Sequence, residues 1–316
     1  MPKSRRRLRP KGRRNTTSRG PLALDRMFDL AGRQGLSAPA PRVLHHYTTW
    51  AGAEGILASR QFWATAHECT NDEAELATAD AIVIEVAKEL RASASGTPLK
   101  VLDSFIDRYS QVQITESVTA CLVCFSVARD DEQQWKKYAD DGFGICLTLR
   151  TLDEPAPNLP STALCKVDYS ESSWRNGIRG AFEQFCAQLS RVESCRRNLD
   201  LGLSALHRIA AFWCITAKRA EWADEQEYRH VTLVPRSSNL LQSRVAGGRT
   251  IEYLPVFLRR DRKRIALAEL LIGPNRDAEK TRQDLQRLLA DNGYEDGSIE
   301  YPTIAASARP SWRSLA

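Results

Sequence analysis

Two glutamates and an arginine alternate in the segment EQEYR, at positions 225, 227 and 229. The longer run EQEYRHVTLV has the alternation typical of a β-strand, in which successive side chains point to opposite faces of the sheet. We therefore expect Glu225, Glu227 and Arg229 to share one face. Such a face is either a solvated ladder of ion pairs, which adds little to stability, or the edge of a catalytic site. The residue types alone do not decide between the two.

A second group of interest is the tripeptide His46-Tyr47-Thr48. The segment Val43–Thr48 predicts a strand, on which His46 and Thr48 lie on the same face. A histidine beside a hydroxyl can bind a ribose or an amide through hydrogen bonds. The alternative is an edge strand whose polar groups are satisfied within the fold.

A third group consists of Asn71 and Asp72 with Glu75, close to the predicted start of a long helix. Three side chains with carbonyl or carboxylate oxygens could bind a metal ion or a ligand hydroxyl. A helix cap explains Asn71 and Asp72 equally well, and capping is the commoner role of these residue types.

The stretch from residue 120 to residue 149 is expected to position these groups. Ala120–Val127 and Ile145–Leu149 are apolar runs with the length of strands. Between them, Trp135 and Tyr138 are three residues apart, which puts both rings on one face of a short helix. The rings could border a pocket at the strand ends, or they could only pack in the core, as aromatic side chains usually do.

Strands and helices are mixed along the rest of the chain without a regular repeat. This pattern predicts one α+β domain over residues 41–316, with a mixed, largely antiparallel sheet and flanking helices. Further strands are expected over 61–65, 164–169, 225–234, 251–258, 267–274 and 298–304. Helices are expected over 53–58, from about 74 to 93, and over 100–109, 172–197, 199–219 and 279–293.

The charge of the chain is unevenly distributed. Nine of the 45 basic residues, and no acidic residue, fall within positions 1–19, so the remainder holds 36 basic against 39 acidic residues. Residues 1–40 therefore predict a disordered basic tail and linker, and only residues 1–19 have the charge to attract a nucleic acid. No secretory signal or membrane-spanning run is recognised, which predicts a cytoplasmic location without membrane contact.

Common signatures of nucleotide-binding loops, zinc proteases and serine hydrolases do not occur in the sequence. Cys121 and Cys124 form a single CxxC on a predicted strand, where their odd offset puts them on opposite faces. No second such pair and no nearby histidine completes a zinc site. We expect no bound metal, and we interpret both cysteines as packing residues.

Several short motifs, in their order along the chain, resemble the bacterial domain of unknown function 2971. The resemblance covers nearly all of the chain after residue 40. The motifs are His46-Tyr47-Thr48, Thr70-Asn71-Asp72 with Glu75, Cys124-Phe125-Ser126, Trp135 with Tyr138-Ala139, Glu225 with Glu227-Tyr228-Arg229, and Leu271-Ile272-Gly273-Pro274. That family implies no established activity, although its type suggests a bacterial toxin or a phage-defence effector.

A more distant resemblance, to ADP-ribosyltransferases, implies an ADP-ribosyltransferase-like fold and NAD as the substrate. It is based on the order of a histidine-x-Thr strand, a middle-strand motif and a late Glu-x-Glu. The sequence departs from that pattern in having Tyr47 where many members have glycine, and in the distance of Tyr138 from the middle strand.

The resemblance implies a role for each matching residue. Glu227 would stabilise the developing charge on the ribose, and Glu225 would orient or deprotonate an acceptor that is either protein, nucleic acid or water. Nicotinamide would stack on an aromatic ring, and a strand-borne histidine with its hydroxyl partner would hold the ribose and the amide. The expected NAD-binding residues are His46, Tyr47, Thr48, Phe125, Ser126, Trp135 and Arg229, with Tyr138 beside the glutamates.

The alternative hypothesis is a non-enzymatic binding protein on a similar fold, in which the clusters are structural and the basic tail contacts nucleic acid. The two hypotheses differ in whether His46, Ser126, Tyr138 and Glu227 converge on one pocket. Unrelated positions would be scattered over the fold.

Overall fold

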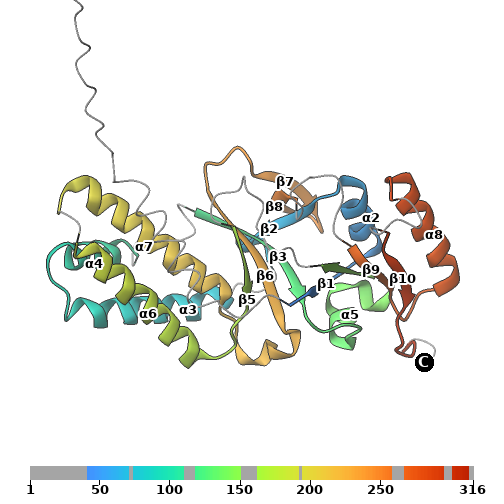
Figure 1. The fold of residues 1–316 in the computed structure, drawn as a ribbon, viewed down its shortest axis with the longest axis horizontal. Coiled ribbons are helices and arrows are strands. Elements are labelled where there is room, and N and C mark those ends of the chain that lie inside the picture. The colour runs from blue at the N-terminus through green and yellow to red at the C-terminus, as the bar shows by residue number, and fades with distance from the viewer. Residues whose placement is uncertain are drawn as a thin grey trace, which may run out of the picture.

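The computed structural model describes residues 41–70, 74–109, 118–150, 162–191, 194–257, 267–294 and 301–312. The basic tail, the linker, Asn71 and Asp72 lie outside the described residues, and the side chain of Glu75 is not described. Within the described part, strands and helices build one mixed sheet with helices on both faces (Figure 1). The predicted α+β class with a mixed, largely antiparallel sheet is confirmed.

The sheet has ten strands, and eight of them follow the order β10-β9-β4-β1-β3-β2-β8-β7. β6 pairs with β3 and β5. Among the described strands, β9 and β10 are the one pair that is parallel. The strands are β1 (Val43–Thr48), β2 (Phe62–Ala66), β3 (Val118–Ser126), β4 (Ile145–Arg150), β5 (Thr162–Lys166), β6 (Glu227–Pro235), β7 (Gln242–Ala246), β8 (Arg249–Val256), β9 (Leu267–Ile272) and β10 (Thr303–Ala306).

The sheet forks at β3. Along one edge of β3, Ser126 pairs with His45 of β1, whereas Cys121 and Leu122 pair with β2. Between these two pairings, the carbonyl of Cys124 accepts a hydrogen bond of 2.9 Å from Nδ1 of His46 instead of from a neighbouring strand. The other edge of β3 pairs with β6 from Val118 to Ser126. β3, with Phe125 and Ser126, is thus a direct neighbour of both β1, with His46 and Thr48, and β6, with Glu227.

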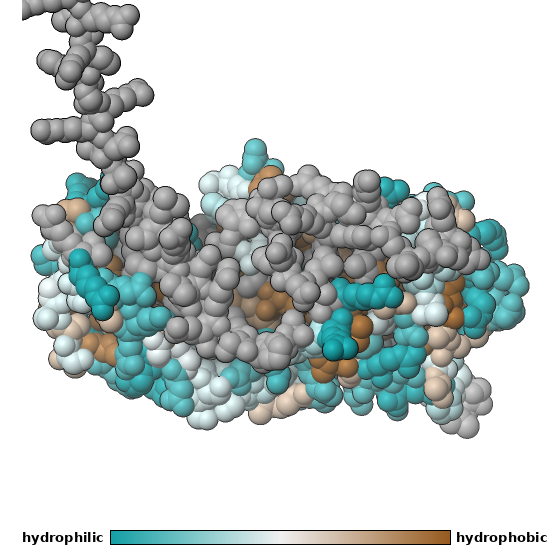
Figure 2. All heavy atoms as spheres, in the orientation of Figure 1, coloured by the Kyte–Doolittle hydropathy of each residue, from teal (hydrophilic) through white to brown (hydrophobic). Residues whose placement is uncertain are grey.

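Helices cover both faces of the sheet. Four of them, α3, α4, α6 and α7, gather at one end of the molecule and pack on β3, β5 and β6, while α5 packs on β1, β4 and β9 of the same face (Figure 1). Helices α2 and α8 cover the opposite face. The bounds are α2 (Trp50–Ser59), α3 (Ala74–Arg91), α4 (Gly96–Tyr109), α5 (Glu132–Tyr138), α6 (Glu171–Leu189), α7 (Arg196–Thr216) and α8 (Ala278–Asp291). On the side of the molecule seen in Figure 2, hydrophobic residues reach the described surface only in small groups.

The structure differs from the predicted elements in three places. The strand expected from Glu225 begins at Glu227, because Glu225 ends a 3-10 helix, η4 (Ala220–Glu225), and Gln226 has a positive φ of 45°. The first of the two predicted helices after β5 ends at Leu189 and not near residue 197. Strand β7 was not predicted, because QSRVA has no strong hydrophobic alternation and most of its residues are exposed.

Two glycines of α6 give a matched test of the packing between α6 and α7. A Cβ at Gly177 would lie 2.3 Å from Cη2 of Trp213, whereas no atom lies within 4 Å of a Cβ at Gly180. Alanine in a helix is favoured over glycine by about 1 kcal/mol, so Gly180→Ala should stabilise the protein slightly. Gly177→Ala should cost about 1–3 kcal/mol through overpacking. Urea unfolding of both variants measures the difference, and equal stability would contradict this packing.

Candidate functional site

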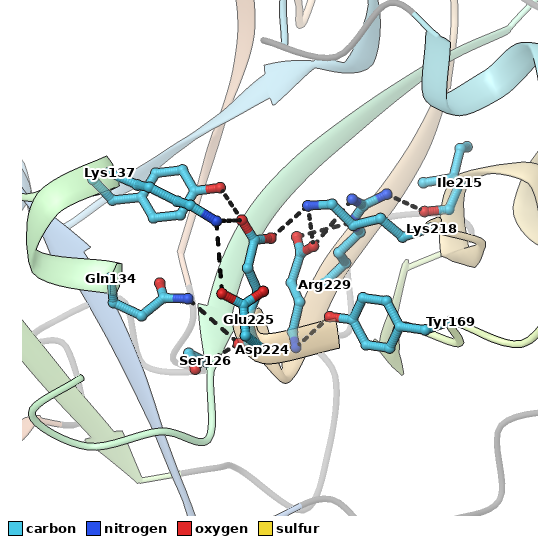
Figure 3. Close-up of polar contacts among 11 residues, drawn as sticks. Ser126, Gln134, Lys137, Tyr169, Ile215, Lys218, Asp224, Glu225 and Arg229 are labelled. Atoms are coloured by element: carbon cyan, nitrogen blue, oxygen red, sulfur yellow. Dashed lines mark hydrogen bonds and ion pairs between the residues drawn. The ribbon is translucent and has the colours of Figure 1, made fainter. Parts of the chain in front are cut away.

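A buried cluster of four charged side chains lies where α7, η4 and β6 meet (Figure 3). The ammonium of Lys218 lies 2.6 Å from Oε2 of Glu225 and 3.1 Å from Oε2 of Glu227. Arg229 donates two hydrogen bonds to Glu227, of 2.9 Å from Nε and 3.1 Å from a terminal nitrogen. The four residues are only 3–7% exposed. The interpretation of these residues as a solvated ladder of ion pairs is therefore wrong.

Local backbone structure brings these side chains together. Lys218 follows the end of α7, where its N–H donates to the carbonyl of Asp168. The left-handed conformation of Gln226 separates Glu225 from the strand that starts at Glu227. Although the two glutamates belong to different elements, Lys218 binds both carboxylates. We refer to Lys218, Glu225, Glu227 and Arg229 as the charge cluster.

Polar side chains of α5 and β3 contact the charge cluster on its outer side. The hydroxyl of Tyr138 donates to Oε1 of Glu225 at 2.7 Å, and Nζ of Lys137 lies 3.5 Å from the same oxygen. Ser126 donates from its hydroxyl to the backbone carbonyl of Glu225 at 2.7 Å. Tyr138 is 38% exposed, so this side of Glu225 is the side nearest to solvent.

The electrostatic environment keeps Glu227 and Lys218 ionised. Burial alone would raise the pKa of Glu227, but Arg229 and Lys218 outweigh burial and lower the pKa to about 2. Burial would likewise lower the pKa of Lys218, but the two glutamates raise it. Burial and the hydrogen bond to Glu225 raise the pKa of Tyr138, so its hydroxyl remains a proton donor at neutral pH.

Cys124 lies beside the charge cluster on the same face of β3 as Ser126. Its side chain is exposed to solvent although β3 is a central strand. Burial nevertheless raises the pKa of the thiol far above its usual range, and the charge of Glu227 raises it further. The high pKa makes Cys124 a poor nucleophile. The prediction that Cys121 and Cys124 only pack is right for Cys121, which is buried in the core. It is wrong for Cys124, which is exposed and lies beside Glu227.

Directly opposed polar residues form a row across five neighbouring strands on this face. The register pairs Glu269 of β9 with Thr148, Thr148 with His45, His45 with Ser126, and Ser126 with Glu227. His45 is 3% exposed and lies 2.9 Å from the Thr148 hydroxyl through Nδ1. The charge cluster is one end of this polar row, and the pair of Arg129 with Glu269 is the other.

His45 gives a prediction for the pH dependence of stability. Burial, and then the charge of Arg129, lower the pKa of His45 to about 4 from 6.5. Above the pKa of the unfolded chain, a histidine with a lowered pKa in the folded protein is neutral in both states and the full stability is present. As the pH falls toward the pKa of the folded protein, the unfolded chain binds a proton that the folded protein does not, and stability is lost. The free energy of unfolding should therefore fall by about 3 kcal/mol more in the wild type than in His45→Gln between pH 6.5 and 4. Urea unfolding across this range measures it, and parallel curves would refute the assignment.

The structure brings together some of the predicted site residues and separates others. Ser126, Tyr138, Glu225, Glu227 and Arg229 meet at the charge cluster. The expectation that His46 joins them is wrong, because its strand neighbour His45 is the residue that faces Ser126. His46 instead contacts the rings of Phe62 and Phe125 on the other face of the sheet. Thr48 shares the strand parity of His46, so the expected NAD-binding set is divided between the two faces.

The aromatic residues of the predicted site are mostly structural. Trp135 is fully buried and packs edge-on against Tyr47, with ring centroids 4.9 Å apart. The hydroxyl of Tyr47 donates to the carbonyl of Ala128 and accepts from the N–H of Asp131, so it fixes the loop before α5. Neither Trp135 nor Phe125 has an exposed face for a ligand.

Sequence reasoning missed four residues around the charge cluster. Lys218 is the link between the glutamates, and the ring of Trp222 lies over Lys137 and Lys218, with its centroid 4.5 Å and 5.2 Å from their ammonium groups. The hydroxyl of Tyr169 accepts the N–H of Glu227 at 2.9 Å. The segment AKRAEW just before the glutamates was a usable signal, because a lysine close to two acids of a candidate site is a natural counter-charge.

The described residues contain neither a metal site nor a membrane-spanning helix. No group of three or more histidine, cysteine, aspartate or glutamate side chains there could hold a metal ion. No helix in that part of the chain has both the length and the apolar character needed to cross a bilayer.

Comparison with known proteins yields no relative: no family model, no curated protein and no solved structure matches the chain. The resemblances to the domain of unknown function 2971 and to ADP-ribosyltransferases therefore remain predictions from the motifs.

Proposed function

We propose that the charge cluster is the active site of an NAD-dependent ADP-ribosyltransferase-like enzyme. The observation that supports this proposal best is the convergence of two buried carboxylates, Ser126, the half-exposed Tyr138 and the exposed Cys124. These residues come from two parts of the chain, β3 with α5 and η4 with β6, and the hydrogen bonds between the two parts join residues 87 and 99 positions apart. Convergence of titratable groups from distant segments next to solvent-exposed side chains is typical of an active site.

The geometry favours a different assignment of the two glutamates from the one that the motifs imply. Both carboxylate oxygens of Glu227 accept hydrogen bonds from Arg229, and one also contacts Lys218. Glu225 contacts Tyr138 on the side nearest to solvent. In this proposal Glu225 is the carboxylate that faces the ribose, and Glu227 fixes Lys218 and Arg229.

Cleavage of the bond between nicotinamide and ribose passes through a state with positive charge on the ribose. A carboxylate held in a poorly hydrated site stabilises such a charge more than one in water does. Glu225 is 3% exposed, and its partners Tyr138 and Lys218 hold its position. The nicotinamide that leaves is neutral, so no acid is needed to protonate it. The eight cysteines, all unpaired, suit an enzyme of the reducing cytoplasm.

Ligand binding tests this proposal without assuming turnover. NAD should raise the midpoint of thermal unfolding in proportion to the logarithm of its concentration above the dissociation constant. ADP-ribose should act similarly, and nicotinamide alone should act weakly. A midpoint that does not respond to NAD or ADP-ribose at millimolar concentration would contradict the proposal.

A structural role for the charge cluster is the second candidate. Lys218 and Arg229 compensate the charges of Glu225 and Glu227, so the four residues form a neutral group that needs no ligand. In this case the chain is a binding protein, with residues 1–19 attracting nucleic acid through nine basic groups.

Deletion of residues 1–19 tests this second candidate. The deletion should leave the thermal midpoint nearly unchanged and should weaken retention of DNA or RNA at low salt, because phosphate contacts release counterions. Unaltered retention would assign nucleic-acid binding to another surface.

A further inference from the structure

The loop before α5 is connected to the C-terminal segment through Asp130. Its carboxylate accepts hydrogen bonds from Nε1 of Trp135 at 2.8 Å, from the hydroxyl of Ser307 at 2.5 Å and from the N–H of Ala308 at 2.9 Å. The Arg309 guanidinium donates to the Asp130 backbone carbonyl. Asp130 has a positive φ of 58°, which is uncommon for a residue with a side chain. Its many contacts compensate for the cost of this conformation.

The same C-terminal segment contacts the other end of α5. Nε1 of Trp312 donates to Asp141 at 3.0 Å, and the ammonium of Lys136 lies 5.3 Å from the centroid of a Trp312 ring. A Cβ on Gly142 would lie 2.8 Å from Trp312, so the indole packs directly on this turn. We call residues 307–312 the C-terminal strap. In Figure 1 it follows β10 at the side of the molecule where α5 lies.

Helix α5 depends on such contacts. It has seven residues, and an isolated helix of that length is not stable in water. Trp135 packs on Tyr47 from the sheet side, and the strap holds both ends of the helix from the outer side. The face between these contacts presents Lys137 and Tyr138 to Glu225.

We infer that Asp130 and Trp312 are positioning residues, which hold Tyr138 at Glu225 through the C-terminal strap. No contact joins either residue to the charge cluster within the described structure, so both act through α5. That the C-terminal strap positions α5 follows from contacts within this chain. That this positioning matters for NAD turnover rests on the function proposed above.

The placement of α5 is tested first, by amide hydrogen exchange and by the alkylation rate of Cys124. Trp312→Ala and Asp130→Ala should each raise the exchange rate of the α5 amides at least about tenfold, because local opening becomes easier. Alkylation of Cys124 should quicken in parallel, since both Cys124 and Tyr138 contact glutamates of the charge cluster. Asp130→Asn, which keeps an acceptor oxygen, should restore part of the protection. Thr303→Ala is the matched control, because Thr303 bonds only Ala268 of β9 and leaves the strap intact.

The role in catalysis is tested by a double-mutant cycle on NAD turnover. Asp130→Ala should lower turnover in the wild-type background and should add little once Tyr138→Phe has removed the hydroxyl. Additive losses, or α5 exchange rates equal to those of Thr303→Ala, would overturn the inference. If the wild type does not cleave NAD, the exchange and alkylation results still decide whether the strap positions α5.

Discussion

Glu225→Gln should lower the rate of NAD cleavage by about 100-fold or more, because it removes the negative charge opposite the ribose in the transition state. The amide has the shape of the carboxylate, so ground-state binding of NAD should change little. An interaction made mainly in the transition state lowers turnover far more than affinity. The measurement is kcat and KM for nicotinamide release, with thermal melts to show that the variant is folded.

Asp224→Asn is the matched control for this prediction. Asp224 precedes Glu225, is half-exposed, and lies 3.9 Å from Lys137 without contacting Lys218. Its neutralisation should change kcat less than threefold. Equal losses in the two variants would indicate a general effect of charge near the charge cluster and would contradict the role assigned to Glu225.

Lys218→Met should have the largest effect on stability, with a cost of about 3–5 kcal/mol, because it leaves two buried carboxylates with one cation. Lys218 is 7% exposed and contacts both glutamates. The double variant Lys218→Met with Glu225→Gln should recover part of the loss, since it removes one unpaired charge together with its partner. Urea unfolding at pH 7 measures both variants.

Lys100→Met serves as the control for Lys218→Met. Its ammonium bonds Ser194 at an exposed position, so its loss should change stability by less than about 0.5 kcal/mol. A cost for Lys218→Met as small as that of Lys100→Met would mean that water reaches the glutamates and that the charge cluster is weakly coupled.

The sequence was informative about elements with strong periodicity. The apolar runs of β3 and β4, and the short helix that contains Trp135 and Tyr138, correspond to elements in the structure. Alternation also put Glu227 and Arg229 on one face correctly. Such patterns are readable because burial of one face imposes the period of the element on the sequence.

The relation between strands could not be read in the same way. Alternation shows that His46 and Thr48 share a face, but it does not show which face of β1 meets the Ser126 side of β3. That choice depends on a single pairing, His45 with Ser126, at the fork of the sheet. A shift by one residue reverses every side chain of the strand, which is why His46 was expected at the site and His45 lies in the polar row.

The contacts that complete the site depend on chain segments distant in sequence. Lys218 meets the glutamates only because the backbone becomes extended at Ala217, directly after α7. The left-handed conformation of Gln226 is not evident from its residue type. The strap contacts Asp130 across more than 170 residues. Local patterns contain no information about such tertiary neighbours.

The release of nicotinamide from NAD by the purified wild-type protein is the most direct test of the proposed active site. We expect saturable release, with one ADP-ribose, free or attached to an acceptor, formed for each nicotinamide, and a rate that falls about 100-fold or more in Glu225→Gln. Release no faster than that of a heat-denatured sample, at millimolar NAD and with protein and nucleic-acid acceptors present, would contradict the assignment of NAD chemistry to the charge cluster.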